Sequence, residues 1–179
     1  MTLQTDTSDA PGQALVITRE FDAPRTLVFR AFAEAERLAR WWGPQGFEIQ
    51  VKKLDFRPGG VFHYRMAHPS GHEMWGQFYF REIVAPERIV WVNTFSDPDG
   101  GLTRAPFGPD LATFPLEVLN TVTLEEHGGK TTLRLHAYPT NATAEERATF
   151  EGLMASMQQG YGASLDQLAA LLGSVDTPA

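Results

Sequence analysis

The sequence predicts an α+β protein in which a curved antiparallel sheet of seven strands surrounds one long C-terminal helix. Residues 143–172 carry the one long helical pattern, and seven shorter segments alternate apolar with polar side chains. Tight turns join most of these segments, which is typical of antiparallel strands. The apolar face of such a long helix can be buried only if the sheet bends around it.

The first strand is predicted over residues 14–21, and two short helices are predicted after it, over residues 24–42. Arg19 falls on the apolar side of this strand, where its stem snorkels or its guanidinium pairs with a carboxylate. The remaining strands are predicted over residues 45–55, 61–66, 74–84, 88–95, 116–126 and 131–138. Residues 96–115 are rich in Pro and Gly without periodicity, which is typical of a mobile insertion or a functional lid.

The C-terminal helix is predicted from apolar residues at steps of three and four, which share one helix face. They are Phe150, Leu153, Met154, Met157, Tyr161, Leu165, Leu168, Leu171 and Leu172. Thr143 followed by Glu146 is typical of a capping box, and Gly173 is a typical helix stop. Gly160 and Gly162 each cost about 1 kcal/mol relative to Ala, so packing has to stabilise this helix. These two glycines either admit a strand closely or open a gap beside Tyr161.

Composition limits the classes of function that the chain can have. It has 179 residues, a net charge of −7 and no cysteine. Lys and Arg form no cluster, so nucleic acid and anionic membranes are not expected as partners. No apolar run reaches the ~20 residues of a membrane span, and no signal peptide is visible, so a cytoplasmic protein is expected. We expect one domain over residues 14–173, a disordered tail over residues 1–13 and a short tail over residues 174–179.

A curved sheet that holds a helix along part of its length can leave a cavity at one end. The inward faces carry aromatic and Met side chains, which either pack an ordinary core or line an adaptable pocket. The candidate ligand-binding residues are Trp42, Phe62, Tyr64, Met66, Phe78, Trp91, Asn93, Phe95, Met154, Met157 and Tyr161. The inward polar candidates, which would orient a ligand, are Arg19, Tyr64, Asn93, Asn120 and Tyr161.

Two adjacent tryptophans precede the turn at Gly43 and Pro44. One ring, either Trp41 or Trp42, is expected to fill the core where the short helices meet the sheet. The other is expected to point elsewhere, toward the mouth of the cavity.

No catalytic residue, cofactor or metal site is predicted. His68, His72 and Glu73 flank a hairpin turn, where solvated side chains are the usual arrangement. Isolated histidines expected at the surface are His63, His127 and His136. The sequence contains no nucleophile motif and no phosphate-binding glycine loop. Acid or base catalysis would need a positioned group, and no carboxylate stands on a predicted inward face.

Several ordered motifs resemble one family. They are REFDAP at residues 19–24, Val28 with Phe29, WWGP at residues 41–44, DFRPGG at residues 55–60, Gly76 with Phe78, and PER at residues 86–88. This pattern, over about residues 15–172, resembles the bacterial homologues of the activator of the ninety-kilodalton heat-shock chaperone ATPase, in the START-like (SRPBCC, birch-pollen-allergen-like) superfamily. The resemblance implies a helix-grip fold with a hydrophobic cavity between the sheet and the last helix. It also suggests a chaperone partner, although the eukaryotic activator uses a separate N-terminal domain for which this chain has no room.

Three functions follow from this pattern. The first is binding of a small apolar or aromatic molecule in the cavity, with residues 96–115 shaping its entrance. The second is a cyclase or hydrolase in the same cavity, which requires an inward acid or base with a shifted pKa. The third is a protein-binding module, chaperone-associated, with an exposed apolar patch around Phe107 and Phe114. A homodimer is left open.

Overall fold

The structure, a computed structural model, describes residues 13–174. The tail expected at residues 1–13 therefore lies outside the described residues, apart from residue 13. Of the expected C-terminal tail, only Ser174 is described, and it belongs to the last helix.

Within residues 13–174, eight strands and five helices follow one another along the chain. Their order is β1 (Leu15–Phe21), α1 (Arg25–Ala33), α2 (Ala35–Trp41), β2 (Glu48–Leu54), β3 (Val61–Ala67), β4 (Glu73–Val84), β5 (Arg88–Ser96), β6 (Leu102–Thr103), the 3-10 helix η1 (Pro109–Leu111), β7 (Glu117–His127), β8 (Lys130–Thr140), α3 (Ala144–Gly152) and α4 (Met154–Ser174).

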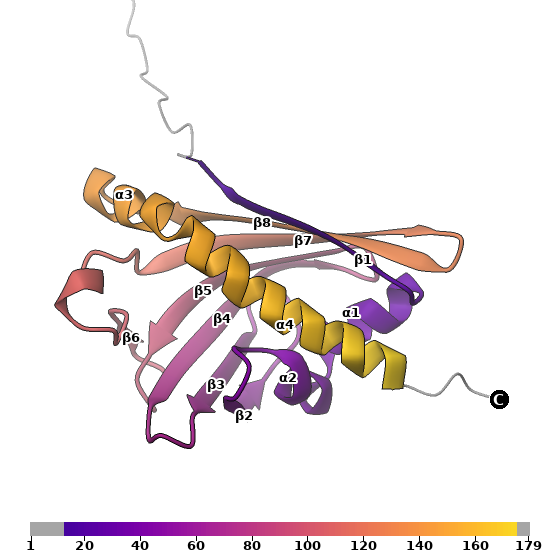
Figure 1. Cartoon of the computed structure of the whole chain (residues 1–179), viewed down its shortest axis with the longest axis horizontal. Helices are drawn as coiled ribbons and strands as arrows, with labels where there is room; N and C mark the ends of the chain where they lie inside the picture. The colour runs from indigo at the N-terminus through magenta and orange to yellow at the C-terminus, as the bar shows by residue number, and fades with distance from the viewer. Residues whose placement is uncertain (1–12, 175–179) are drawn as a thin grey trace, which may run out of the picture.

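All strands belong to one antiparallel sheet with the order β1-β8-β7-β5-β4-β3-β2, and β6 adds a short pairing to β5. The sheet bends so that α3 and α4 run across its concave face, while α1 and α2 close one end (Figure 1). The register shifts between Val51 and Lys53 and between Phe80 and Glu82, and such irregularities increase local bending. The expected helix-grip fold is thus confirmed, with β6 as the strand that sequence reasoning missed.

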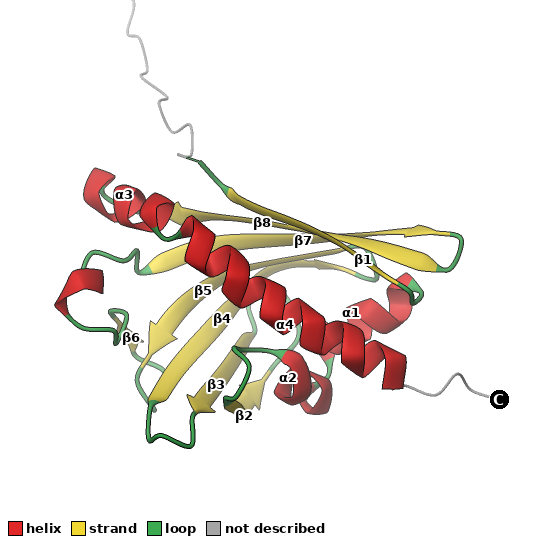
Figure 2. Cartoon of the chain, viewed as in Figure 1, coloured by secondary structure: helices red, strands yellow, loops and turns green. Residues whose placement is uncertain are grey.

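The long C-terminal helix is interrupted, contrary to the expectation of one helix over residues 143–172. Leu153 separates α3 from α4, with φ −101° and ψ 0°, and its N–H bonds to the carbonyl of Phe150 three residues back. Gly152, which disfavours helix, ends α3 directly before this break. Helices α3 and α4 still follow one another across the same face of the sheet (Figure 2). The helix start is confirmed, because the Thr143 hydroxyl accepts a hydrogen bond of 3.1 Å from the Glu146 N–H. The helix continues through Gly173, which is therefore not its stop.

The segment after β5 is folded and covers part of both faces of the sheet. On the convex face, its first turn covers His63, whose Nε2 lies 3.2 Å from the carbonyl oxygen of Asp97. His63 is consequently buried, contrary to the expectation of a surface position, whereas His127 and His136 are exposed. The Gln77 amide donates a hydrogen bond of 2.6 Å to the Gly100 carbonyl in the same turn.

Arg19 pairs with the carboxylate of Asp166 on α4, which is the second of the two outcomes expected for it. Within the part of the chain that the structure describes, no helix is both long enough and apolar enough to cross a bilayer.

Candidate functional site

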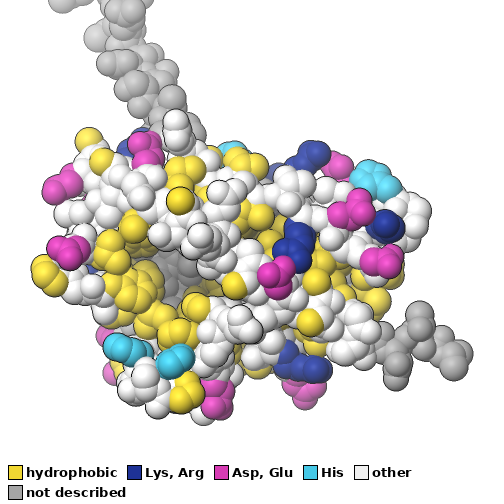
Figure 3. Space-filling model, in the orientation of Figure 1, with side chains coloured by type: hydrophobic (Ala, Val, Ile, Leu, Met, Phe, Trp, Pro, Cys, Tyr) yellow, Lys and Arg dark blue, Asp and Glu magenta, His cyan; other side chains and the backbone are white. Residues whose placement is uncertain are grey.

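A cavity of about 370 Å³ lies between the concave face of the sheet and the helices α3 and α4. Its floor is formed by residues of β1, β3, β4, β5, β7 and β8, and its roof by α3 and the first half of α4. The corner at residues 42–44 closes the inner end, and residues 104–116, which we call the rim segment, border the outer end. Figure 3 shows a hollow on this face of the molecule, bordered mainly by hydrophobic side chains.

Seven of the eleven candidate residues from the sequence line this cavity. They are Trp42, Tyr64, Met66, Asn93, Phe95, Met157 and Tyr161. They come from the corner after α2, from β3 and β5, and from α4, so segments far apart in the sequence meet here.

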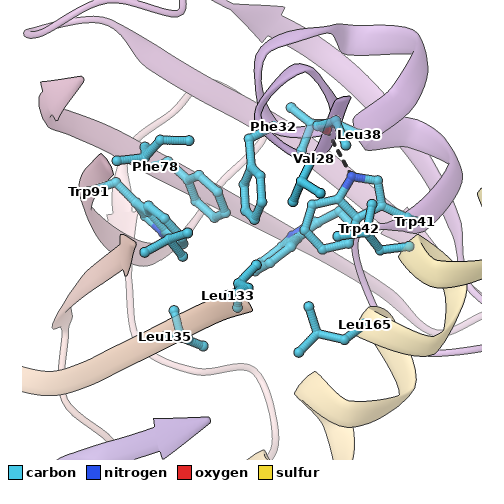
Figure 4. Packing of buried hydrophobic residues seen from close by; sticks show 14 of the residues in the cluster. Val28, Phe32, Leu38, Trp41, Trp42, Phe78, Trp91, Leu133, Leu135 and Leu165 are labelled. Atoms are coloured by element: carbon cyan, nitrogen blue, oxygen red, sulfur yellow. Dashed lines mark hydrogen bonds between the residues drawn. The ribbon is translucent and has the colours of Figure 1, made fainter. Parts of the chain in front are cut away.

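The other four candidates lie elsewhere. Phe62 is fully buried in the core, and Trp91 stacks on Phe78 with their ring centroids 4.8 Å apart (Figure 4). The ring of Trp42 packs edge-on against Phe78 at 4.9 Å, and Trp42 lines the cavity whereas Phe78 does not. Met154, in the first turn of α4, is half-buried against the core and outside the cavity lining.

The two tryptophans before Gly43 take different roles. Trp41 is buried, packs against Phe32 at 4.9 Å and donates a hydrogen bond of 2.8 Å to the Ala31 carbonyl (Figure 4). Trp42 lines the inner end of the cavity rather than its mouth. Trp41 is thus the core residue of the pair.

The rim segment supplies lining residues that sequence reasoning did not place in the site, above all Phe107, Leu111 and Phe114. Phe107 packs edge-on against Phe95 at 5.5 Å, and Phe114 lies 6.1 Å from the same ring. The signal available in the sequence was the presence of three apolar side chains in a segment without periodicity. It does not reveal which strand the segment folds against.

Contacts between side chains join the rim segment to α3. The hydroxyls of Thr113 and Thr149 lie 2.7 Å apart, and Arg104 approaches Glu146 at 3.4 Å. Arg104 also donates a hydrogen bond of 3.3 Å to the carbonyl of Phe114 within the segment. The rim segment and α3 therefore form a connected border on the open side of the cavity.

The corner at the inner end is fixed to α4. The carbonyl oxygen of Gly43 accepts hydrogen bonds from the Ser164 hydroxyl at 2.8 Å and from the Gln167 amide at 2.9 Å. Gly43 has φ +100°, a conformation that favours glycine, and a Cβ here would lie 2.8 Å from Ile49. These bonds hold Trp42 in place beside the cavity.

The helix glycines leave open space instead of admitting a strand. A Cβ built on Gly160 or Gly162 would meet no described atom within 4 Å, leaving out the helix's own backbone. Gly160 belongs to the cavity lining beside Tyr161. The sequence left two alternatives for Gly160 and Gly162, which were close approach of a strand and a gap beside Tyr161. The structure shows the gap.

Several polar atoms gather at the inner end of the cavity. The Tyr161 hydroxyl donates a hydrogen bond of 3.4 Å to the amide oxygen of Asn120, which is fully buried. Within residues 13–174, Trp42 Nε1 and Asn93 Oδ1 are buried and have no hydrogen-bond partner. The cavity wall therefore contains both polar groups that are satisfied and polar groups that are not.

Burial keeps both tyrosines of the cavity protonated. Desolvation raises the pKa of Tyr161 to about 12 and raises the pKa of Tyr64 further. The nearby Tyr161 hydroxyl adds to the rise at Tyr64. The nearby Trp42 N–H acts in the opposite direction and lowers the pKa of Tyr64. It does not, however, meet the geometry of a hydrogen bond to any described residue. At neutral pH both hydroxyls are neutral hydrogen-bond donors and acceptors.

The lining is uncharged. Among residues 13–174, no Asp, Glu, Lys, Arg or His contributes to the cavity wall. The described part of the chain also contains no group of three or more His, Asp or Glu side chains that could hold a metal ion. His68, His72 and Glu73 therefore do not form such a group.

A bent antiparallel sheet that holds a long C-terminal helix, with two short helices after its first strand, defines the helix-grip class of proteins. Residues 22–173 match the family described as Activator of Hsp90 ATPase homolog 1-like protein, and this chain belongs to that family. No curated protein matches the sequence significantly.

Solved structures agree with this assignment. Protein Ms6760 from Mycobacterium smegmatis is 27% identical with a TM-score of 0.71, and the match covers 91% of this chain and 92% of that one. A protein from Arthrobacter aurescens is 25% identical with a TM-score of 0.74, over 93% of this chain and 87% of that one. A protein from Silicibacter pomeroyi named for the same family is 20% identical with a TM-score of 0.68, over 90% and 98%, and shows likeness of fold alone.

Proposed function

We propose that this protein binds a small, uncharged and mainly apolar molecule in the cavity between the sheet and α4. The observation that carries the proposal is the chemistry of the lining, which is apolar and aromatic with a few neutral polar groups and without charged side chains among residues 13–174. A volume of about 370 Å³ falls in the range of small-molecule sites. A charged ligand would lose its hydration there without gaining a counter-charge.

The shape of the wall supports a ligand that is not tightly specified. Met66, Met74 and Met157 contribute flexible side chains, which adapt to ligands of different outline. Tyr64, Phe95 and Phe114 contribute flat apolar surfaces against which a ring or a chain can pack.

Binding is better supported than proton-transfer chemistry. The titratable groups that line the cavity, among the described residues, are Tyr64 and Tyr161, and their raised pKa values make them poor bases at neutral pH. A protein-binding role is supported less, because Phe107 is half-exposed but packs on Phe95, and Phe114 faces the cavity. The patch suggested by these two rings belongs to the cavity rim.

The neutral fluorescent probe N-phenyl-1-naphthylamine tests the proposal directly. We expect it to bind the full chain at one site with enhanced emission. Ser156→Trp, which places a bulky ring in the lining, should weaken this binding by about tenfold or more, since it fills space that the probe needs. Ala155→Trp is the matched control, because Ala155 is exposed on the same helix outside the lining. Absence of binding to the unaltered protein, or equal binding by both variants, would contradict the proposal.

A further inference from the structure

The inner end of the cavity differs chemically from its outer end. Trp42, Tyr64, Asn93 and Tyr161 bring polar atoms to the inner end, whereas Phe107, Leu111 and Phe114 make the rim apolar. The Trp42 ring lies 6.3 Å from Tyr64 and 6.0 Å from Tyr161. Asn93 pairs in register with Phe78, the ring on which Trp42 packs. The polar groups therefore form one cluster.

Two members of this cluster are not satisfied by the protein. The Trp42 side chain is more than nine-tenths buried, and its Nε1 has no partner among residues 13–174. Asn93 is only partly buried as a whole, but its Oδ1 atom is buried and likewise has no partner among these residues. Buried polar atoms are normally hydrogen-bonded, and leaving one without a partner is unfavourable. An indole N–H requires an acceptor, and an amide oxygen requires a donor.

We propose that the ligand carries a neutral hydroxyl group at one end of an apolar body and binds with this group innermost. The ligand oxygen accepts a hydrogen bond from Trp42 Nε1, and its proton is donated to Asn93 Oδ1. The neutral hydroxyls of Tyr64 and Tyr161 border the same space. This inference rests on the proposed function and names the chemical class of ligand: alcohols and phenols with an apolar remainder.

The structure offers a matched comparison for the role of Trp42. Trp91 Nε1 is also buried without a partner among the described residues, but it lies in the core against Phe78 and outside the lining of this cavity. Removing the N–H at position 91 removes the same chemical group at a place that the ligand does not reach.

Three probes separate the two hydrogen bonds from simple apolar burial. Naphthalene offers neither donor nor acceptor, 2-methoxynaphthalene offers an acceptor, and 2-naphthol offers both. Their dissociation constants are measured by displacement of N-phenyl-1-naphthylamine. 2-Naphthol is the most water-soluble of the three, so simple partition would make it the weakest ligand. We expect it instead to bind at least about tenfold more tightly than naphthalene, since two buried polar atoms gain partners.

Variants assign this preference to its residues. The preference of each compound is its affinity relative to that of naphthalene. Trp42→Phe should reduce this preference for 2-naphthol and abolish it for 2-methoxynaphthalene. Asn93→Leu should reduce it for 2-naphthol alone. Trp91→Phe should leave all three ratios unchanged. Far-ultraviolet circular dichroism verifies that each variant is folded, and ratios rather than absolute affinities are compared, so a general loosening of the cavity does not count as support.

The outcomes separate the two proposals. If naphthalene binds as tightly as 2-naphthol, or if the preference survives both Trp42→Phe and Asn93→Leu, the hydroxyl assignment is wrong while cavity binding stands. If neither the fluorescent probe nor any of the three compounds binds the unaltered protein, the proposed function itself fails.

Discussion

The Ser164 hydroxyl and the Gly43 carbonyl oxygen, 2.8 Å apart, connect the middle of α4 to the corner that follows α2. The bond is buried, and Gln167 supplies a second donor to the same oxygen. Because Trp42 precedes Gly43 directly, this contact positions the inner wall of the cavity. The helix is thus held at its centre by polar contacts as well as by apolar packing.

Ser164→Ala should lower the free energy of unfolding by about 1 kcal/mol, because Gly43 keeps its bond from Gln167. Adding Gln167→Leu should cost more than the sum of the two single changes, since the carbonyl oxygen then loses both donors. Urea denaturation measures both values. Ser156→Ala serves as the control and should have little effect on stability, because Ser156 lies at the solvent-exposed border of the cavity on the same helix. Strict additivity would show that Gly43 finds another donor.

Gly76 makes room for Tyr64. The two residues are paired across β3 and β4, and a Cβ on Gly76 would lie 2.5 Å from the tyrosine hydroxyl oxygen and 2.6 Å from Cζ of its ring. Gly76→Ala should therefore displace the ring, lower the free energy of unfolding by about 1 to 3 kcal/mol and weaken binding of N-phenyl-1-naphthylamine. Gly76→Ala combined with Tyr64→Leu should recover part of the stability. No recovery would mean that the clash is with the backbone.

Gly162 gives the opposite prediction with the same substitution. It lies inside α4, and an added Cβ would meet nothing within 4 Å among the described residues, leaving out the helix's own backbone. Gly162→Ala should raise the free energy of unfolding by about 0.5 to 1 kcal/mol, because alanine favours the helix and reduces the freedom of the unfolded chain. Thermal and urea unfolding measure this change. A destabilised variant would show that a neighbour occupies the space beside this glycine.

The architecture was predictable because its signals are local. A few neighbouring residues set the alternation of apolar and polar side chains in β3 and β5. A few neighbouring residues also set the helical spacing of apolar side chains around Leu165 and Leu168. The break at Leu153 was missed because a single glycine in a helix pattern is often tolerated, and only the packing of α3 decides the outcome.

The cavity wall was predictable in part, for the same reason. Alternation identifies the concave face of the sheet, and so it found Tyr64 and Phe95. It cannot say how far along the sheet the helices extend, which is why Phe78 and Trp91 were grouped with the cavity although they lie in the core. The position of Phe107 depends on the path of a segment without periodicity, and that path is fixed by long-range contacts.

Stability should fall steeply in alkali because of Tyr64, which is buried, and Tyr161, which is partly buried. Burial raises the pKa of Tyr161 to about 12, above the ordinary value near 10, so the folded state holds its proton where the unfolded state has lost it. This contribution to stability is complete below pH 10 and is lost as the pH rises toward 12, by up to about 1.4 kcal/mol per pH unit. Urea denaturation between pH 9 and 11.5 should show a shallower decline for Tyr161→Phe than for the unaltered protein. Identical slopes would mean that the hydroxyl is solvated.

The contact between Thr113 and Thr149 allows a test of whether the rim segment controls access to the cavity. Their hydroxyls are 2.7 Å apart, close enough for cysteines at both positions to form a disulfide, and the chain has no other cysteine to interfere. The bridge would fix the rim segment to α3. Release of N-phenyl-1-naphthylamine, followed by stopped-flow fluorescence, should become about tenfold slower or more in the oxidised double variant.

Reduction by dithiothreitol separates the effect of the bridge from that of the substitutions. The reduced double variant should release the probe at the rate of the unaltered protein, because the cysteines then preserve the size of the residues they replace. The equilibrium affinity should change less than the rate, since the bridge restrains the border of the cavity and leaves the polar cluster at Trp42 and Asn93 untouched. If oxidation leaves the release rate unchanged, the probe leaves by another route, and the gap beside Gly160 on α4 is the next opening to close.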